Sequence, residues 1–197
     1  QDLTLDLRNS QIDPTSGYLS RISTEIAGLG GDAKYLRAKL ENTFHYQIAT
    51  DWVVHLVGEA GHMVDFGEDI RINDRFFIGG ESLRGFEESG IGPRVSGTDD
   101  ALGGQSYAAG TVELSFPLGL PKELGFNGAF FTDFGTLINP VEDDPSILDE
   151  SSLRMSAGVG LKWRSPFGPI RLDVALPVLK EDFDEEEILR FNFGTRF

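Results

Sequence analysis

Apolar and polar residues alternate with a period of two over most of this 197-residue chain. Between Leu153 and Trp163, the odd-numbered positions hold Leu, Met, Ala, Val, Leu and Trp, whereas the even-numbered positions hold Arg, Ser, Gly, Gly and Lys. Successive side chains of a strand point to opposite faces of a sheet, so this period predicts strands. No segment carries the sustained stripe of an amphipathic helix. We therefore expect an all-β, antiparallel fold with turns between the strands.

Nine segments share this pattern, and several have the roughly nine to eleven residues that a tilted membrane strand needs. They are Leu3 to Leu7, Tyr18 to Ala27, Tyr35 to Tyr46, Trp52 to Met63, Thr111 to Phe116, Phe126 to Gly135, Leu153 to Trp163, Ile170 to Leu176 and Leu189 to Phe197. Their connections alternate between short ones, such as Ile48 to Asp51, and long ones, such as Asp65 to Gly104. Short turns at one end and long loops at the other are typical of outer-membrane barrels.

Alternation alone fits two opposite architectures. A soluble barrel turns its apolar face inward, whereas an outer-membrane barrel turns its apolar face toward lipid. Here the polar face mixes glycine with charged residues of both signs, which suits a crowded polar lumen, and the apolar face carries large aromatic side chains. We therefore predict a transmembrane β-barrel. Four aromatic residues near strand ends are expected in the interfacial girdle: Tyr46, Trp52, Trp163 and Phe197.

Composition excludes several classes of function. The formal charge of −15 argues against a nucleic-acid partner, because phosphate binding needs clustered Lys and Arg. The chain has no Cys, which removes thiolate metal sites and Cys nucleophiles. Its three histidines, His45, His55 and His62, lack a recognisable metal-ligand spacing, and no nucleophile elbow is present. We expect no cofactor, no metal site and no enzymatic activity.

The longest connection contains the most distinctive motifs. It carries Arg75-Phe-Phe-Ile-Gly-Gly80, then Leu83-Arg-Gly-Phe86 and Ile91-Gly-Pro93. The Arg84-Gly85 pair permits a tight tip that projects a guanidinium group.

Two later strands offer carboxylates to this guanidinium. The motif Phe131-Thr-Asp133-Phe-Gly135 places its Phe, Asp and Gly on one strand face, and Glu113 lies on the polar face of the preceding strand. Either carboxylate would match Arg84, because guanidinium groups form forked, charge-assisted hydrogen bonds with carboxylates.

With these motifs the chain resembles the C-terminal barrel region of the BamA family of outer-membrane protein assembly factors, within the bacterial surface antigen superfamily. The resemblance covers essentially the whole chain. It rests on the loop tip Arg84, Gly85 and Phe86, on the strand motif Phe131, Asp133 and Gly135, and on Met155-Ser-Ala-Gly-Val-Gly160. The segments Gly28 to Asp32 and Pro121 to Gly125 are similar to the alphaproteobacterial branch.

The resemblance implies a fold, a location and a mode of action. Family members fold client proteins into the outer membrane of Gram-negative bacteria, working with assembly lipoproteins, at a seam between the first and last barrel strands. The loop arginine, here Arg84, is thought to lock the loop in the lumen through carboxylates, here Asp133 and Glu113. Aromatic residues of the last strand form an assembly signal, which corresponds here to Phe191, Phe193 and Phe197.

The chain departs from the family in length. The family barrel has sixteen strands, within the range of bacterial outer-membrane barrels, and follows periplasmic POTRA modules. We expect residues 1–197 to be the C-terminal part of such a barrel, with an inward loop at about 65–104 and no POTRA domain. Three alternatives stay open: a homodimer in which two half-barrels complete one, a polypeptide-secretion pore of the same superfamily, and a stand-alone eight-stranded barrel without insertase activity.

Overall fold

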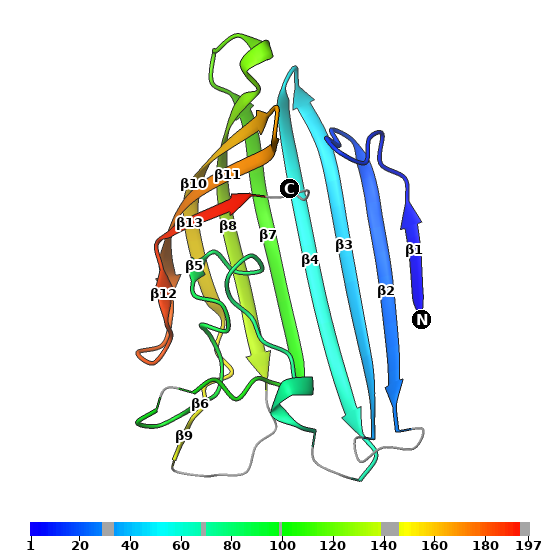
Figure 1. Ribbon diagram of the computed structural model, residues 1–197, viewed down its shortest axis with the longest axis vertical. Coiled ribbons are helices and arrows are strands. Elements are labelled where there is room, and N and C mark those ends of the chain that lie inside the picture. Colours follow the sequence, from blue (N-terminus) through cyan, green and yellow to red (C-terminus); the bar gives the residue numbers. More distant parts are fainter. Residues whose placement is uncertain (29–33, 68–69, 99, 139–145, 194–197) are drawn as a thin grey trace.

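The computed structural model describes residues 1–28, 34–67, 70–98, 100–138 and 146–193. Its main element is one antiparallel sheet of nine strands that curves into a wall (Figure 1). In spatial order the strands are β1 (Asp2–Asp6), β2 (Gly17–Ala27), β3 (Tyr35–Ala49), β4 (Trp52–Asp65), β7 (Ser106–Pro117), β8 (Phe126–Ile138), β10 (Arg154–Ser165), β11 (Gly168–Leu179) and β13 (Leu189–Phe193). Each of the nine predicted segments corresponds to one of these strands, so the all-β, antiparallel prediction is confirmed.

Most strand boundaries differ from the prediction by one to three residues, and the start of β7 differs by five. Strand β7 begins at Ser106 rather than Thr111, because its first half, Ser-Tyr-Ala-Ala-Gly, is made mostly of small residues whose alternation is weak. Strand β13 is described from Leu189 as far as Phe193. Phe197, which the sequence assigns to the aromatic girdle and the assembly signal, lies outside the described residues.

The wall is open at both edges. Within the described part of the chain, β1 pairs only with β2 and β13 pairs only with β11, so the sheet does not close on itself (Figure 1). All five residues of β1 are exposed. This arrangement is that of a half-barrel, and it differs from the alternative of a closed eight-stranded barrel.

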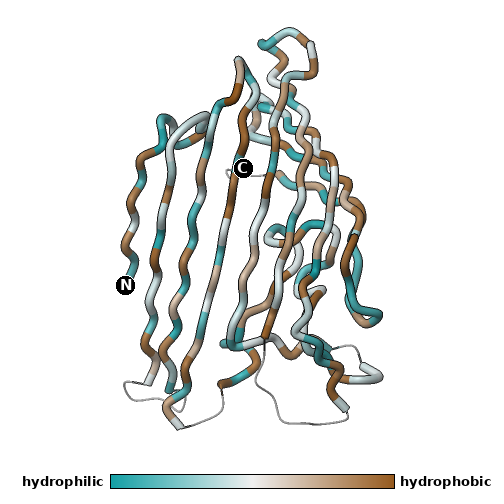
Figure 2. The backbone as a smooth tube through the Cα atoms, turned by 180° about the vertical axis from the view of Figure 1, so that it is seen from behind, coloured by the Kyte–Doolittle hydropathy of each residue, from teal (hydrophilic) through white to brown (hydrophobic). Residues whose placement is uncertain are grey.

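The two faces of the wall differ in chemistry as the alternation predicted. Large apolar side chains lie exposed on the outer face, including Leu56, Phe130 and Leu176, and brown segments alternate with paler ones along each strand in Figure 2. Charged side chains on the opposite face are buried, including Glu113, Asp133 and Asp173. This inversion of the usual soluble pattern fits a lipid-facing exterior and a polar lumen. In the described residues, no helix is long and apolar enough to cross a membrane.

Aromatic side chains gather toward the short-turn ends of the central strands. Trp52 stacks on Phe116 with ring centroids 5.5 Å apart, and Trp163 stacks on Phe126 at 5.2 Å. Tyr46 is exposed in the same hairpin as Trp52. Stacked aromatic rings at strand ends are what an interfacial girdle needs.

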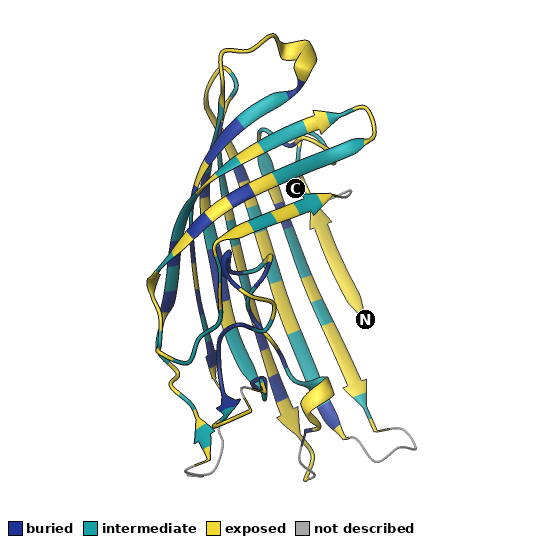
Figure 3. Ribbon diagram, turned by 60° about the vertical axis from the view of Figure 1, so that its left-hand side comes forward, coloured by how far each residue is buried: buried dark blue, intermediate teal, exposed yellow. Residues whose placement is uncertain are grey.

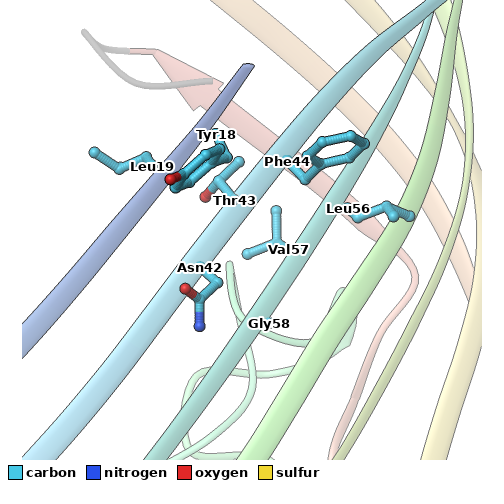
Figure 4. Close-up of a pocket in the computed structure, with 8 residues that line it drawn as sticks. All are labelled: Tyr18, Leu19, Asn42, Thr43, Phe44, Leu56, Val57 and Gly58. Atoms are coloured by element: carbon cyan, nitrogen blue, oxygen red, sulfur yellow. The ribbon is translucent and has the colours of Figure 1, made fainter. Parts of the chain in front are cut away.

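Two glycines on opposite faces of the wall give a matched test of its packing. A Cβ at Gly158, on the inner face of β10, would lie 2.4 Å from the Val174 carbonyl oxygen and 2.5 Å from the Phe131 ring. A Cβ at Gly58 would meet nothing within 4 Å, because Gly58 opens into a shallow outer groove beside Phe44 and Leu56 (Figure 4).

Gly158→Ala is expected to lower the free energy of unfolding by about 1–3 kcal/mol through overpacking. Gly58→Ala, its control, is expected to change that free energy by less than about 0.5 kcal/mol. Urea unfolding in detergent micelles, followed by the heat-modifiable band on electrophoresis, measures both. Equal effects of the two substitutions would contradict the assigned faces.

Candidate functional site

The connection between β4 and β7, residues 66–105, folds back onto the concave face of the wall (Figures 1 and 3). It contains the short helix η1 (Ile72–Asp74) and two-residue strands β5 (Gly85–Phe86) and β6 (Arg94–Val95). Bridges between Phe76 and Gly104 and between Ile78 and Ile91 hold its two limbs together. The loop is therefore a folded element that presents residues 83–86 to the wall.

The main apolar core of the described residues lies between this loop and the wall. Its buried members come from the loop and from β3, β4 and β8: Tyr35, Met63, Ile70, Phe76, Ile78, Leu83, Phe86, Ile91 and Leu137. Leu83 and Phe86, on either side of Arg84 and Gly85, are fully buried. If the loop left the wall, this core would be exposed. Burial of its apolar side chains therefore stabilises the docked conformation of the loop.

The loop tip depends on backbone conformations that only glycine adopts easily. Gly85 has a φ of +95°, and a Cβ there would lie 3.0 Å from Ser156 Cβ on the wall. Gly79 has a φ of +136°, and a Cβ there would lie 1.9 Å from the Glu87 carbonyl oxygen. Both positions need glycine for its φ and for its lack of a side chain. The motif glycines thus let the tip approach β10 closely.

Arg84 binds the two carboxylates that the sequence proposed for it. Its Nε and Nη2 donate to the two Asp133 carboxylate oxygens at 2.7 Å each, and its backbone N–H donates to Asp133 at 3.0 Å. Its Nη1 donates to Glu113 at 2.9 Å. All three residues are buried. The bidentate geometry makes the Arg84–Asp133 contact both strong and directional.

The strand motif surrounds this ion pair. The Arg84 guanidinium lies 3.4 Å from the centre of the Phe131 ring, in cation–π contact. A Cβ at Gly135 would lie 3.7 Å from Leu83, an ordinary van der Waals distance, so Gly135 faces the loop at close range. The Thr111 hydroxyl donates to Asp133 at 2.8 Å. Phe131, Asp133 and Gly135 therefore face the loop tip together, each through a different contact.

The site is larger than the sequence indicated. Arg171 donates to Glu113 at 2.6 Å and to Asp173 at 2.5 Å, and Lys162 also binds Glu113. Asp173 lies 3.9 Å from Arg84. The sequence places these residues on the polar faces of β10 and β11. Only the register of β7, β8, β10 and β11 brings them to the same place on the wall.

Opposite charges in this cluster balance. Three cations, Arg84, Lys162 and Arg171, face three carboxylates: Glu113, Asp133 and Asp173. Buried charges are tolerated when they are paired and hydrogen-bonded, and removal of one member leaves another uncompensated. The cluster can therefore act as a lock that holds one loop position and disfavours partly docked ones.

The three histidines lie on both faces of the wall. His45 and His55 contact each other on the inner face with their Nδ1 atoms 2.7 Å apart, whereas His62 lies on the outer face beside Ser106. Among the described residues, no group of three His, Cys, Asp or Glu side chains is arranged to hold a metal ion. The alternation along β4 separates His55 from His62, but the sequence did not indicate the cross-strand pair of His45 and His55.

Two of the three residues of the predicted assembly signal lie in the described part of the chain. Phe191 and Phe193 are exposed on the outer face of β13, the edge strand, opposite Leu172 and Ile170 of β11. They lie on the face of the wall opposite to Arg84, so the loop lock and the aromatic edge are separate features of the wall.

Comparisons with known proteins agree with this geometry. Residues 1–197 match the family model described as the Omp85 superfamily domain. The outer membrane protein assembly factor BamA of Neorickettsia risticii is 36% identical over 197 residues, which are 99% of this chain and 26% of that protein. Sorting and assembly machinery component 50 homolog A of Xenopus laevis is 40% identical over 209 residues, covering 99% of this chain and 44% of that protein.

A solved structure shares the same fold. The crystal structure of BamA from Haemophilus ducreyi lacking POTRA domains 1-3 superposes with a TM-score of 0.85 at 26% identity, over 96% of this chain and 41% of that chain. The chain thus spans about a quarter of the length of its bacterial curated relatives, 26% and 24% for the first two. Because the family model covers every residue and the wall and loop match a solved member, the chain belongs to the Omp85 superfamily.

Proposed function

We propose that this chain is the C-terminal part of the barrel of an outer-membrane protein assembly factor, integral to the outer membrane of a Gram-negative bacterium. The observation that carries the proposal is an open lipid-facing wall with a loop locked on its polar face by Arg84. The likeness to proteins named as BamA supports the assignment. The activity is the folding and insertion of client outer-membrane proteins, without covalent catalysis or a cofactor.

The physical basis is the pairing of edge strands. An edge strand carries unpaired N–H and C=O groups, and lipid cannot satisfy them. A client strand that reaches such an edge gains hydrogen bonds that the bilayer cannot offer. In this mechanism β13 supplies one side of the seam, with Phe191 and Phe193 facing lipid, and Phe197 completes the assembly signal.

The edge formed by β1 needs a different partner. In the proposed barrel of sixteen strands, further strands of the same protein pair with β1, within the strand numbers known for such barrels. A second copy of this chain is the other way to pair both edges. Clients, assembly lipoproteins and outer-membrane lipids are the proposed partners, and nucleic acid is not among them.

A secretion pore of the same superfamily is the competing function. A pore needs a lumen that polypeptide can enter, whereas here Leu83, Arg84 and Phe86 are buried against the inner face of the wall. A folded loop fixed by buried ion pairs favours a stable scaffold beside the seam over an open conduit.

The test is a chimera in which this chain replaces the matching segment of BamA from Neisseria meningitidis, which is 30% identical over 220 residues. We expect the chimera to become heat-modifiable, which shows that it has folded, and to fold urea-denatured client barrels in proteoliposomes. A chimera carrying Arg84→Ala is the matched variant and should fold fewer clients. A chimera that is itself heat-modifiable but inserts no client would contradict the proposal.

A further inference from the structure

Three long connections meet at the end of the wall opposite the short turns, and each is tied to the other two. Strand β6 of the long loop pairs with β9 (Ile147–Leu148), and β5 pairs with β12 (Glu186–Glu187) (Figure 1). The third tie, between the β8–β10 connection and the β11–β13 connection, is the hydrogen bond from Ser152 to Glu181, next to an ion pair between Arg154, the first residue of β10, and Asp184. The three connections therefore form a closed triangle of contacts.

The Arg154–Asp184 pair is fully buried, with both side chains 0% exposed. Arg154 donates through Nε to one carboxylate oxygen at 2.9 Å and through Nη2 to the other at 3.2 Å. Its Nη1 donates to the Ser152 carbonyl at 2.9 Å and also to the Glu150 carbonyl. The Phe183 ring lies 5.6 Å from the guanidinium. A residue at the start of β10 thus fixes residues 181–184.

Glu185, next to Asp184, contacts residues 87–94, the limb of the long loop that follows its tip. The Glu185 carboxylate binds Arg94, which is 2% exposed, at 3.1 Å. The Glu185 carbonyl accepts from the Glu87 N–H at 3.0 Å, and its N–H donates to the Gly90 carbonyl at 2.9 Å. At the base of the same connection, a hydrogen bond to Glu186 raises the pKa of Lys180. The β11–β13 connection therefore acts as a clasp over residues 85–94.

This clasp shares no side chain with the Arg84 cluster. Arg84 binds carboxylates on β7 and β8, whereas Asp184 and Glu185 hold the limb that follows the tip. We propose that Arg154 is a positioning residue: through Asp184 it holds the β11–β13 connection as a second lock on the long loop. Its consequence for client assembly rests on the function proposed above, whereas its effect on the loop does not.

The primary variant is Arg154→Met with Asp184→Leu, which removes both charges and leaves neither buried alone. Trypsin reports loop opening, because Arg94 lies in the clasped limb. If the clasp is a lock, cleavage after Arg94 in the folded protein should rise about tenfold, as proteolysis follows the population of the open form. Unaltered cleavage after Arg94 would overturn the inference.

A covalent clasp separates positioning from general stability. The chain has no Cys, so Glu87→Cys with Glu185→Cys introduces a single possible disulfide across the next position of the β5–β12 ladder. Glu185→Cys also removes the carboxylate that binds Arg94, so the reference is the Glu87→Cys/Glu185→Cys chain with Arg154 and Asp184 intact. In the Arg154→Met/Asp184→Leu background, oxidation should restore protection of Arg94 to that reference level, and reduction should abolish it. Protection that stays lost after oxidation would assign Arg154 a merely structural role and overturn the proposal.

The same proteins then measure client folding in the chimera. We expect client insertion to fall with the double variant and to recover on oxidation of the Cys pair. The chimera without these substitutions separates the two proposals. If it inserts no client while oxidation still restores protection of Arg94, the proposed function would be contradicted and the inference about the clasp would be supported. Loss of protection with unchanged insertion would overturn the role of the clasp in assembly.

Discussion

Arg84→Ala is expected to release the long loop and to lower the free energy of unfolding by about 3–5 kcal/mol, the usual cost of removing one partner from a buried ion pair. Asp133 would keep its hydrogen bonds from Thr111 and from the backbone at residue 84, but it would lose its bidentate contact with the guanidinium group. The Phe131 ring would lose its guanidinium partner as well. Urea unfolding and trypsin protection of the loop measure the two effects.

Arg21→Ala is the matched control on the same face of the wall. Arg21 binds Glu41 at 3.5 Å with both side chains more than a third exposed, 37% and 42%. Pairs as exposed as this one contribute about 0–1 kcal/mol. Charge reversal of Arg84 together with Asp133 should recover part of the stability that Arg84→Ala loses. An Arg84→Ala protein with unaltered loop protection and unfolding free energy would contradict the lock.

Glu113→Gln is expected to have an effect of similar size, about 3–5 kcal/mol, because Glu113 is bound by Arg84, Arg171 and Lys162. Without its charge, three cations face two carboxylates in a buried site. Adding Lys162→Met removes one cation and should restore more than half of the lost stability. A double-mutant cycle of Glu113→Gln and Lys162→Met, followed by urea unfolding, measures this coupling.

Glu41→Gln serves as the control for Glu113→Gln, since Glu41 is a half-exposed carboxylate of the inner face. It should lower the unfolding free energy by less than about 1 kcal/mol. If Lys162→Met further destabilised the Glu113→Gln protein, charge balance would not be what holds the cluster together.

The long strands could be predicted because their alternation is strict and their length exceeds that of chance runs. The length of a strand also explains why the sequence analysis did not predict the short strands. Strands β5, β6, β9 and β12 have two residues each, too few to show any period. They form only because a folded loop brings distant segments together, as when β12 meets β5 across about a hundred residues of chain.

The candidate site was predictable in its centre but not in its surroundings. Charge complementarity and a family resemblance pointed to Arg84, Asp133 and Glu113, which the structure brings within hydrogen-bonding distance. Lys162 and Arg171 could be assigned to the polar face but not to Glu113, since alternation fixes a face and leaves the register free. The Arg154–Asp184 pair was missed because Asp184 lies in an acidic connection that reads as a solvated loop.

The central claim is that the outer, apolar face of the wall contacts lipid and the polar face lines the lumen. A single-cysteine scan along β4 tests it most directly. Because the chain has no Cys, each variant from position 55 to position 60 carries one fluorophore. In vesicles with brominated acyl chains, the even positions should be quenched and the odd positions should not, since Leu56, Gly58 and Ala60 point outward. Quenching of the odd positions, or of none, would contradict a lipid-facing exterior and with it the luminal position of the Arg84 loop.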